Sequence, residues 1–199
     1  MGQDKNNRIL SMTWYCDDAP GHPIHGPYHD TEYGFPLSDE AELFERQSLE
    51  IFQAGLSWLL VLKKRPTMIT AFDQFQVDRV AAYKAKDVKR LLNDAGIIRN
   101  RLKVNSIIEN ARRIQALRDS HQSLSAWIAS HHPLPKSEWV KVFKKEFKFM
   151  GGEIVGEFLM SIGYLPNVHK ESCPVFKKIK KLNPPWIQVD FKVYKEKAK

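Results

Sequence analysis

The chain has 199 residues, of which 31 are Lys or Arg and 23 are Asp or Glu, so its formal net charge is +8. Hydrophobic residues make up 43% of the chain and aromatic residues 11%, which excludes a disordered or collagen-like protein. No apolar run approaches the roughly 20 residues of a membrane span, so we expect a soluble protein with one domain and no membrane partner.

The N-terminus contains no apolar stretch of the kind that a secretory signal needs. A reducing, cytoplasmic setting is therefore expected, and association with the nucleoid if the source is bacterial. In that setting Cys16 and Cys173 are interpreted as thiols or metal ligands, with a disulfide left as an alternative. The basic charge favours a polyanion as partner but decides little alone.

The N-terminal third of the chain begins without clear periodicity. Residues 1–37, rich in Pro, Gly and His, are predicted to be irregular, and residues 1–13 to be flexible. Helical spacing then starts: Asp39 and Glu42 form a capping-box pattern for a helix that ends near Gly55, and Ser57 can cap the next helix. Further start signals are Pro66 for a first helical turn and two candidate N-caps, Asp78 and Asp87.

The rest of the chain is also predicted to be mainly helical. A longer helix follows Gly96, shorter helices surround Trp127 and Trp139, and an apolar helix begins after Gly151 and Gly152. A basic tail over residues 177–199 then contains an alternating pattern typical of a strand, from Ile187, Val189, Phe191 and Val193. No function is assigned to the tail.

Two cysteines and two histidines have the chemistry of a closed zinc site. His169 and Cys173 are one helical turn apart, and Cys16 and His29 lie near the other end of the chain. Four such ligands satisfy a tetrahedral Zn²⁺, and no coordination position is left open for catalysis. The spacing alone favours the alternative of buried thiols and ordinary histidines, and other histidines compete as ligands, namely His22, His25, His131 and His132.

A glycine-containing turn between two helical patterns is a candidate helix-hairpin-helix. It spans residues 93–101 and contains Gly96, Arg99 and Arg101. In such a hairpin the backbone N–H groups and the positive end of the second helix receive a DNA phosphate. An ordinary helix-helix turn is the alternative.

A carboxylate and a tryptophan near the turn at residues 53–58 have the chemistry of a base pocket. Trp58 can stack on a base, and Glu50 can accept hydrogen bonds from an exocyclic amine. Gly55 and Leu56 could fill the gap that a flipped base leaves. In the alternative, Trp58 belongs to the core and Glu50 is a solvated helix residue.

The order of these features resembles the 3-methyladenine DNA glycosylase I family from about Trp14 to Cys173. The resemblance is carried by Cys16, Tyr28-His29-Asp30, Glu32-Tyr33-Gly34, Glu50, Gln53-Ala54-Gly55-Leu56-Ser57-Trp58, Val61-Leu62-Lys63-Lys64-Arg65, Asp94-Ala95-Gly96-Ile97-Ile98-Arg99, Phe147-Lys148-Phe149-Met150-Gly151 and the pair His169 and Cys173.

The resemblance implies an all-α, helix-hairpin-helix DNA glycosylase fold whose structural zinc joins the N- and C-terminal segments. The glycosylase domain would span residues 14–176, with the hairpin near 87–115 and the zinc-binding ends at 14–34 and 165–176. Implied zinc ligands are Cys16, His29, His169 and Cys173; implied base-binding residues are Glu50, Tyr28, Trp58, Tyr33 and His25; implied DNA-binding residues are Gly55, Leu56, Gly96, Ile97, Arg99 and Arg101.

The implied activity is that of a monomeric, monofunctional glycosylase of base excision repair, acting on alkylated double-stranded DNA. It would flip out 3-methyladenine and hydrolyse the N-glycosidic bond, with Glu50 as the catalytic carboxylate. His25, Tyr33 and residues 152–157 depart from the family pattern, so any lesion preference other than 3-methyladenine is expected to be determined at these positions. Two alternatives are a non-enzymatic protein that binds alkylation damage and an RNA-directed helical protein.

Overall fold

The computed structural model describes residues 14–195, which form α-helices and short 3-10 helices and contain no β-strand. The predictions for residues 1–13 and 196–199 lie outside these described residues. In chain order the elements are α1 (Tyr15–Asp18), α2 (His25–Thr31), α3 (Glu40–Gln53), α4 (Trp58–Ala71), η1 (Asp73–Phe75), α5 (Val77–Ala81), α6 (Ala85–Asn93), α7 (Arg101–His121), α8 (Leu124–His131), α9 (Lys136–Glu146), α10 (Gly152–Ser161), α11 (Pro174–Lys181), η2 (Pro185–Ile187) and η3 (Phe191–Tyr194). None of the described helices is long and apolar enough to cross a membrane.

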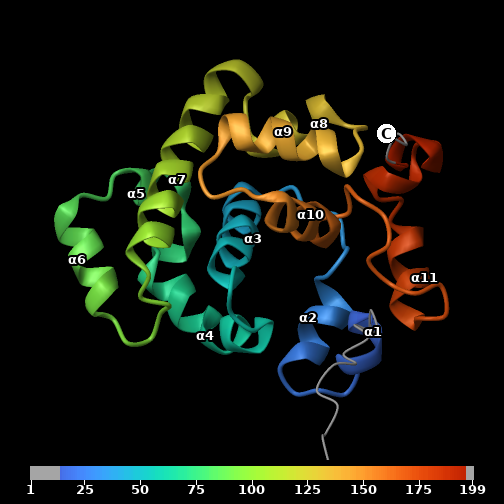
Figure 1. Cartoon of the computed structure of the whole chain (residues 1–199), viewed down its shortest axis with the longest axis horizontal. Coiled ribbons are helices and arrows are strands. Elements are labelled where there is room, and N and C mark those ends of the chain that lie inside the picture. The colour runs from blue at the N-terminus through green and yellow to red at the C-terminus, as the bar shows by residue number, and fades with distance from the viewer. Residues whose placement is uncertain (1–13, 196–199) are drawn as a thin grey trace, which may run out of the picture.

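Helix α3 is the centre of the fold. It lies between the group α4–α7 and the group α8–α10 (Figure 1), and it contacts α4, α7, α8 and α10. All ten residues from Leu43 to Phe52 are therefore buried, including polar ones such as Arg46 and Glu50. Since charged side chains are rarely buried without a partner or a function, this stretch of α3 is where a site is expected.

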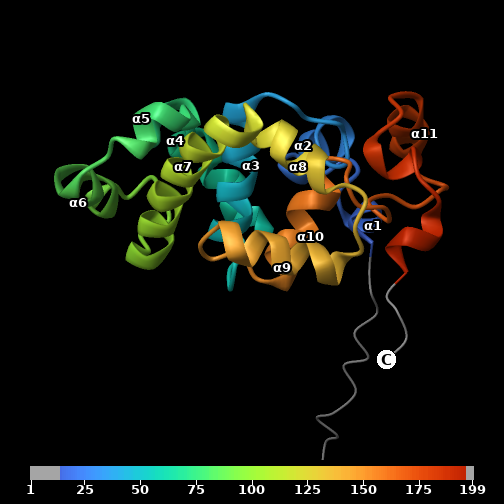
Figure 2. The ribbon, with the colours of Figure 1, turned by 90° about the horizontal axis from the view of Figure 1, so that it is seen from above.

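The two ends of the described chain meet in a small cap built from α1, α2 and α11. Figures 1 and 2 show α11 on the same side of the molecule as α1 and α2. The cap has its own apolar cluster with Cys173, Val175 and Ile179 as its buried members, separate from the large core around α3. So small a cluster offers little hydrophobic stabilisation, which leaves room for another interaction to hold the two ends together.

Most predicted helices are confirmed, together with two of the predicted caps. The Asp39 side chain accepts the N–H of Glu42 at 3.0 Å at the start of α3, and Ser57 Oγ accepts the N–H of Leu60 at 3.3 Å at the start of α4. Between these helices Gly55 has a φ of +79°, a conformation that side-chain-bearing residues rarely adopt.

Three predicted helix starts are wrong. Pro66 lies inside α4, where the packing of Val61 and Met68 into the core on either side outweighs the lost backbone hydrogen bond. Helices α5 and α6 each begin before their predicted aspartate caps. Asp78 lies in the first turn of α5, and Asp87 in that of α6, where its carboxylate still accepts the N–H of Lys84 at 3.0 Å.

Two predictions for the chain ends are also corrected. The N-terminal segment is less irregular than expected, because α1 and α2 form within it. The alternating pattern at 187–193 forms no strand, since the described residues offer no sheet for it to join; it runs from the end of η2 through a bend into η3. Residues 177–181 complete α11. The rest of the described tail packs against the protein: His132 Nε2 lies 2.8 Å from the Tyr194 hydroxyl, and the backbone N–H of Trp186 donates to the carbonyl of Gly163 at 3.3 Å.

Candidate functional site

A pocket of about 300 Å³ lies where the cap meets α3 and α10. Its lining consists of aromatic rings and three polar side chains: Tyr15, Tyr28, Tyr33, Trp58, Glu50, Gln53 and Glu157. The volume is at the lower end of the roughly 300–1,000 Å³ of small-molecule sites, so it suits a ligand the size of a single nucleobase.

The aromatic rings that line the pocket contact one another edge to face. The ring of Tyr28 lies 5.1 Å from that of Trp58 at 64°, and the ring of Tyr15 lies 5.5 Å from that of Tyr33 at 81°. Edge contacts leave ring faces available, and such faces attract flat and positively charged ligands. Trp58 is partly buried: it packs against the main core and also lines the pocket, so it combines the two interpretations that the sequence left open.

Glu50 brings a buried carboxyl group to this pocket. The side chain is only 4% exposed. Burial, reinforced by repulsion from Glu157, raises the pKa of Glu50 to about 8, although the Arg46 guanidinium opposes the shift. Burial also raises the pKa of Glu157. The pocket thus contains two carboxyl groups that resist ionisation while the site is empty.

A network of ion pairs fixes the Tyr28 wall. Arg46 donates to the Tyr28 hydroxyl at 3.1 Å and to Glu32 at 2.9 Å, and its guanidinium lies 4.8 Å from the centre of the Tyr28 ring. Arg65 bridges Glu32 and Glu45, each at 2.7 Å. The network joins α2 to α3 and α4. Because Tyr28 lies on α2 and Glu50 on α3, these ion pairs help to fix the position of Tyr28 relative to Glu50.

A second cavity, of about 510 Å³, lies beside this network. It is larger than the aromatic pocket but less suited to binding a ligand. Its charged lining residues include Glu32, Glu45, Arg46 and Arg65. These four groups already pair with one another, so they are not free to bind a ligand.

Next to the pocket, the turn after α3 presents an exposed apolar side chain. Leu56 is 38% exposed and follows Gly55 at the tip of the turn. Behind the turn, Lys103 Nζ donates to the carbonyls of Phe52 at 2.7 Å and Ala54 at 2.6 Å. The lysine thereby satisfies carbonyl groups at the end of α3 and holds the turn in place.

The hairpin between α6 and α7 is tied to α4. Gly96 accepts a hydrogen bond from Thr67 Oγ1 at 2.6 Å, and a Cβ at Gly96 would come within 3.1 Å of Thr67. The Gly96 N–H donates to the Asp94 carboxylate at 2.7 Å, and the Ile97 side chain is buried. Arg99 and Arg101 are exposed. Of the predicted DNA contacts at the hairpin, only the two arginines present free side chains to solvent.

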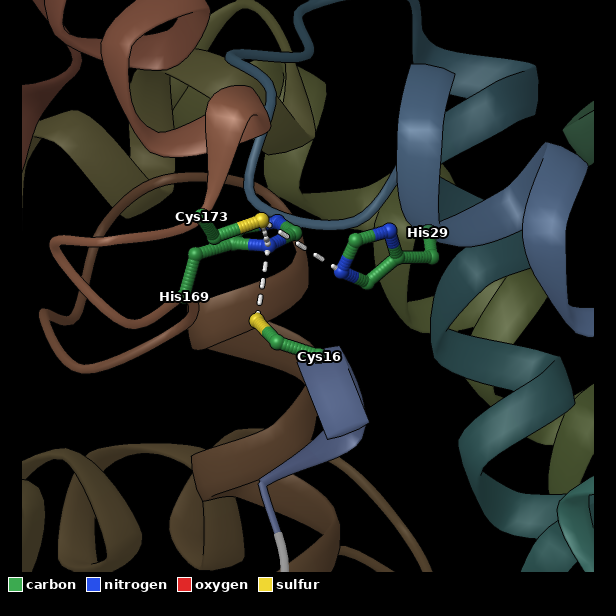
Figure 3. A group of neighbouring side chains, drawn as sticks. All are labelled: Cys16, His29, His169 and Cys173. Atoms are coloured by element: carbon green, nitrogen blue, oxygen red, sulfur yellow. Dashed lines mark hydrogen bonds between the residues drawn. The ribbon is translucent and has the colours of Figure 1, made fainter. Parts of the chain in front are cut away.

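Cys16, His29, His169 and Cys173 converge in the cap, although they come from opposite ends of the chain (Figure 3). Their potential ligand atoms all lie within 4.8 Å of one another. Cys16 Sγ is 3.3 Å from His169 Nδ1, and Cys173 Sγ is 3.7 Å from His169 Nδ1 and 3.8 Å from His29 Nε2. The cluster could hold a metal ion with four ligands. The competing histidines, His22, His25, His131 and His132, lie outside it.

The second nitrogen of each histidine in the cluster has a partner of its own. His29 Nδ1 lies 2.7 Å from the Asp30 carboxylate, and His169 Nε2 lies 2.8 Å from the Tyr33 carbonyl. Such partners fix which ring nitrogen carries the proton and leave the other for a metal.

The structure brings most of the predicted base-site residues together, namely Tyr28, Tyr33, Glu50 and Trp58. His25 does not line the pocket and instead contacts the hydroxyl of Tyr15, 2.9 Å from its Nδ1. Sequence reasoning missed Tyr15, Gln53 and Glu157 as site residues, although Gln53 stood in the motif that carries the family resemblance. The only signal for Glu157 was its place in the segment 152–157 that departs from the family pattern, and Tyr15 had only its position beside Cys16.

Comparisons with known proteins agree on one family. Residues 18–142 match the family described as methyladenine glycosylase. The chain is 39% identical over 179 residues to DNA-3-methyladenine glycosylase 1 of Escherichia coli, which covers 80% of this chain and 93% of that protein. It is 34% identical over 182 residues to the DNA-3-methyladenine glycosylase of Haemophilus influenzae, which covers 82% and 98%.

Solved structures give the same result. A crystal structure of 3-methyladenine DNA glycosylase I superimposes with a TM-score of 0.73 at 36% identity, covering 80% of this chain and 97% of that one. The Staphylococcus aureus enzyme, described for its recognition of 3-methyladenine, gives a TM-score of 0.74 at 29% identity, covering 81% and 95%. With sequence, fold and coverage in agreement, the chain belongs to the 3-methyladenine DNA glycosylase I family.

Proposed function

We propose that the protein is a monofunctional DNA glycosylase that removes 3-methyladenine from alkylated double-stranded DNA. The observation that carries the proposal is the pocket itself, in which the buried carboxyl of Glu50 lies among the rings of Tyr28, Tyr33 and Trp58. Its relatives named above are called 3-methyladenine glycosylases, and one relative's structure contains 3-methyladenine.

The chemistry of the lesion explains why so few groups suffice. Methylation of a ring nitrogen gives the base a positive charge, which makes it a good leaving group. Once flipped from the duplex, the base would stack on the aromatic walls, and its charge would lower the pKa of Glu50 and favour the ionised carboxylate. The bond between the sugar C1′ and the base then breaks with its electron pair moving onto the base, which leaves as neutral 3-methyladenine. Water adds to C1′ and loses a proton to solvent, while the Glu50 carboxylate holds the base in position. No general base is assigned.

Release of the base without strand cleavage follows from the pocket lining. A bifunctional glycosylase uses an amine to form a Schiff base with the sugar. None of the residues that line the pocket in the described structure is a lysine. We therefore expect an abasic site as the product.

DNA would bind across the face that carries the turn after α3. In this proposal Leu56 enters the duplex where the base has left, with Gly55 allowing close approach of the backbone. The hairpin acts as a helix-hairpin-helix that contacts phosphate through Arg99, Arg101 and the N-terminal end of α7. The backbone N–H of Gly96 is already engaged by Asp94, which shifts the expected contact to the arginine side chains.

The cap is proposed to bind one structural Zn²⁺ through Cys16, His29, His169 and Cys173. Tetrahedral zinc with bonds of about 2.3 Å to sulfur and 2.0–2.1 Å to nitrogen separates S from N by about 3.6 Å. Three of the four S–N distances in the cluster, 3.3, 3.7 and 3.8 Å, are close to this value, and all four ligand atoms lie within 4.8 Å of one another. The ion would join the chain ends and take no part in the reaction. The proposed enzyme acts as a monomer, in the cytoplasm if its source is bacterial like its relatives.

The proposal is tested by incubating the protein with methylated duplex DNA and identifying the released bases by chromatography. Wild type should release free 3-methyladenine, and Glu50→Gln should release little while keeping its affinity for undamaged DNA, which phosphate contacts dominate. Glu42→Gln, an exposed change on the same helix, serves as the matched control. Failure of folded wild type to release any base, with DNA binding intact, would support the non-enzymatic alternative.

A further inference from the structure

The pocket contains a second carboxylate that the proposed reaction does not use. Glu157 comes from α10 and lines the same pocket as Glu50, which comes from α3. The two groups are close enough for Glu157 to contribute to the raised pKa of Glu50. Two helices therefore each bring a carboxyl group to the pocket.

No positively charged side chain lines this pocket in the described structure. Arg46, the cation that acts on Glu50, is already shared between Tyr28 and Glu32. On the outer side, Lys136 pairs with Glu153 at 3.2 Å, and its charge also acts on Glu157 and partly opposes the rise of the Glu157 pKa. Glu50 is buried and Glu157 is half-buried, and the pKa of each carboxyl is still raised by burial, so a positively charged ligand would relieve the cost of ionising them.

The aromatic lining favours the same kind of ligand. Ring faces attract cations, and they do so more strongly when water is excluded. A neutral base of the same shape would stack equally well but would leave the two carboxyl groups uncompensated. The combination of rings and paired carboxyl groups therefore distinguishes charged bases from neutral bases, even where the two have the same shape.

We propose that Glu157 is a specificity-determining residue, and that the Glu50–Glu157 pair selects N-alkylated purines whose ring carries a positive charge over neutral bases of the same shape. The inference rests on the proposed function, because it names the class of base that the same site accepts. It predicts that the site discriminates by charge, with Glu157 contributing directly rather than through its neighbours.

Tyr33 is the pocket residue through which Glu157 could act indirectly. Its carboxylate accepts a hydrogen bond from the Tyr33 hydroxyl at 3.1 Å. Glu157→Gln removes the charge but keeps an oxygen that can accept this bond. Tyr33→Phe removes the bond but keeps the charge and the ring. The two variants separate a charge effect from a positioning effect.

The experiment measures binding of two small probes to the full-length protein by calorimetry. The 3,9-dimethyladeninium ion is permanently charged and carries a methyl group in place of the sugar. Its neutral counterpart of the same shape is 3,9-dimethyl-3-deazaadenine, in which a carbon atom replaces the methylated ring nitrogen. Wild type should bind the cation more tightly. Glu157→Gln should reduce that preference by about tenfold or more, because a charge a few ångströms away in a dehydrated site is strongly felt.

The control is Glu153→Gln, which removes the same charge from the same helix at a side chain that is 89% exposed. This variant should change the preference less than about twofold, because surface charges are screened. Tyr33→Phe keeps the carboxyl charge and the ring, so it should alter the affinities for the two probes together and keep the preference between them. The inference is overturned if Glu157→Gln leaves the preference unchanged or weakens both probes equally, or if Tyr33→Phe reproduces its effect.

Release of 3-methyladenine from methylated DNA is measured with the same wild-type preparation. If wild type releases the base yet shows no preference for the charged probe, the charge selection fails and the proposed function stands. If wild type releases no base, the proposed function fails first. Circular dichroism and thermal unfolding of each variant confirm that the affinities compare folded proteins.

Discussion

Replacing Glu50 by glutamine should stabilise the protein at neutral pH while it removes the activity. In the empty pocket the pKa of Glu50 is raised to about 8 from an ordinary value of 4.5. Between these values the unfolded chain releases the proton and the folded protein retains it. The contribution of Glu50 to the free energy of unfolding is therefore largest below pH 4.5, and it falls as the pH rises towards 8.

The size of the effect follows from the same two pKa values. One pH unit corresponds to about 1.36 kcal/mol per proton, and about 2.5 units separate pH 4.5 from pH 7, so the carboxyl costs the folded state about 3 kcal/mol at pH 7. Glutamine has nearly the same shape and does not ionise. The variant should thus be about 3 kcal/mol more stable than wild type at pH 7 and nearly equal to it at pH 4.5.

Urea denaturation of both proteins at several pH values between 4.5 and 7.5 measures the difference directly. Glu42→Gln, on the exposed side of the same helix, should show no comparable pH-dependent gain. A difference between wild type and Glu50→Gln that does not change with pH would refute the reasoning, because it would mean that Glu50 is ionised in the empty pocket.

Three further changes test other parts of the molecule. Cys173→Ser should reduce bound zinc from about one equivalent to almost none and increase amide exchange at both chain ends; zinc-free wild type would contradict this. Lys103→Met should lower the free energy of unfolding in urea by about 2 kcal/mol and slow base release, and an unchanged rate would exclude a role in holding the turn. Arg99→Ala with Arg101→Ala should reduce the salt dependence of DNA affinity by about two ions, whereas an unchanged slope would place phosphate contacts elsewhere.

The sequence predicted helix starts correctly where they depend on an interaction between residues close in the chain. Asp39 and Ser57 each cap the helix that follows, because a short polar side chain reaches N–H groups three residues ahead. The same local reasoning failed for Pro66, since the decisive factor there is core packing along α4, which only the tertiary fold determines. Alternation at 187–193 misled for a similar reason, because a strand needs a neighbouring strand.

The base pocket was predictable only in part. Glu50 and Trp58 lie close in sequence around a recognisable turn, and the family resemblance added Tyr28 and Tyr33. Glu157 reaches the same pocket from α10, more than a hundred residues away, and no spacing rule connects it to Glu50. The prediction that His25 lines the pocket is wrong. Its ring contacts Tyr15, and Tyr15 is the residue that lines the pocket.

The cysteine–histidine cluster and the pocket are structurally coupled, because α2 contributes residues to both. Tyr28 lines the pocket and the next residue, His29, joins the cluster, while the carbonyl of Tyr33 lies against His169. A helix of seven residues is too short to be stable alone. Tyr28 is therefore positioned from two sides, by its hydrogen bond from Arg46 and by the neighbouring His29 in the cysteine–histidine cluster. Loss of the cluster should move the ring of Tyr28 away from Glu50, although no residue on α3 is changed.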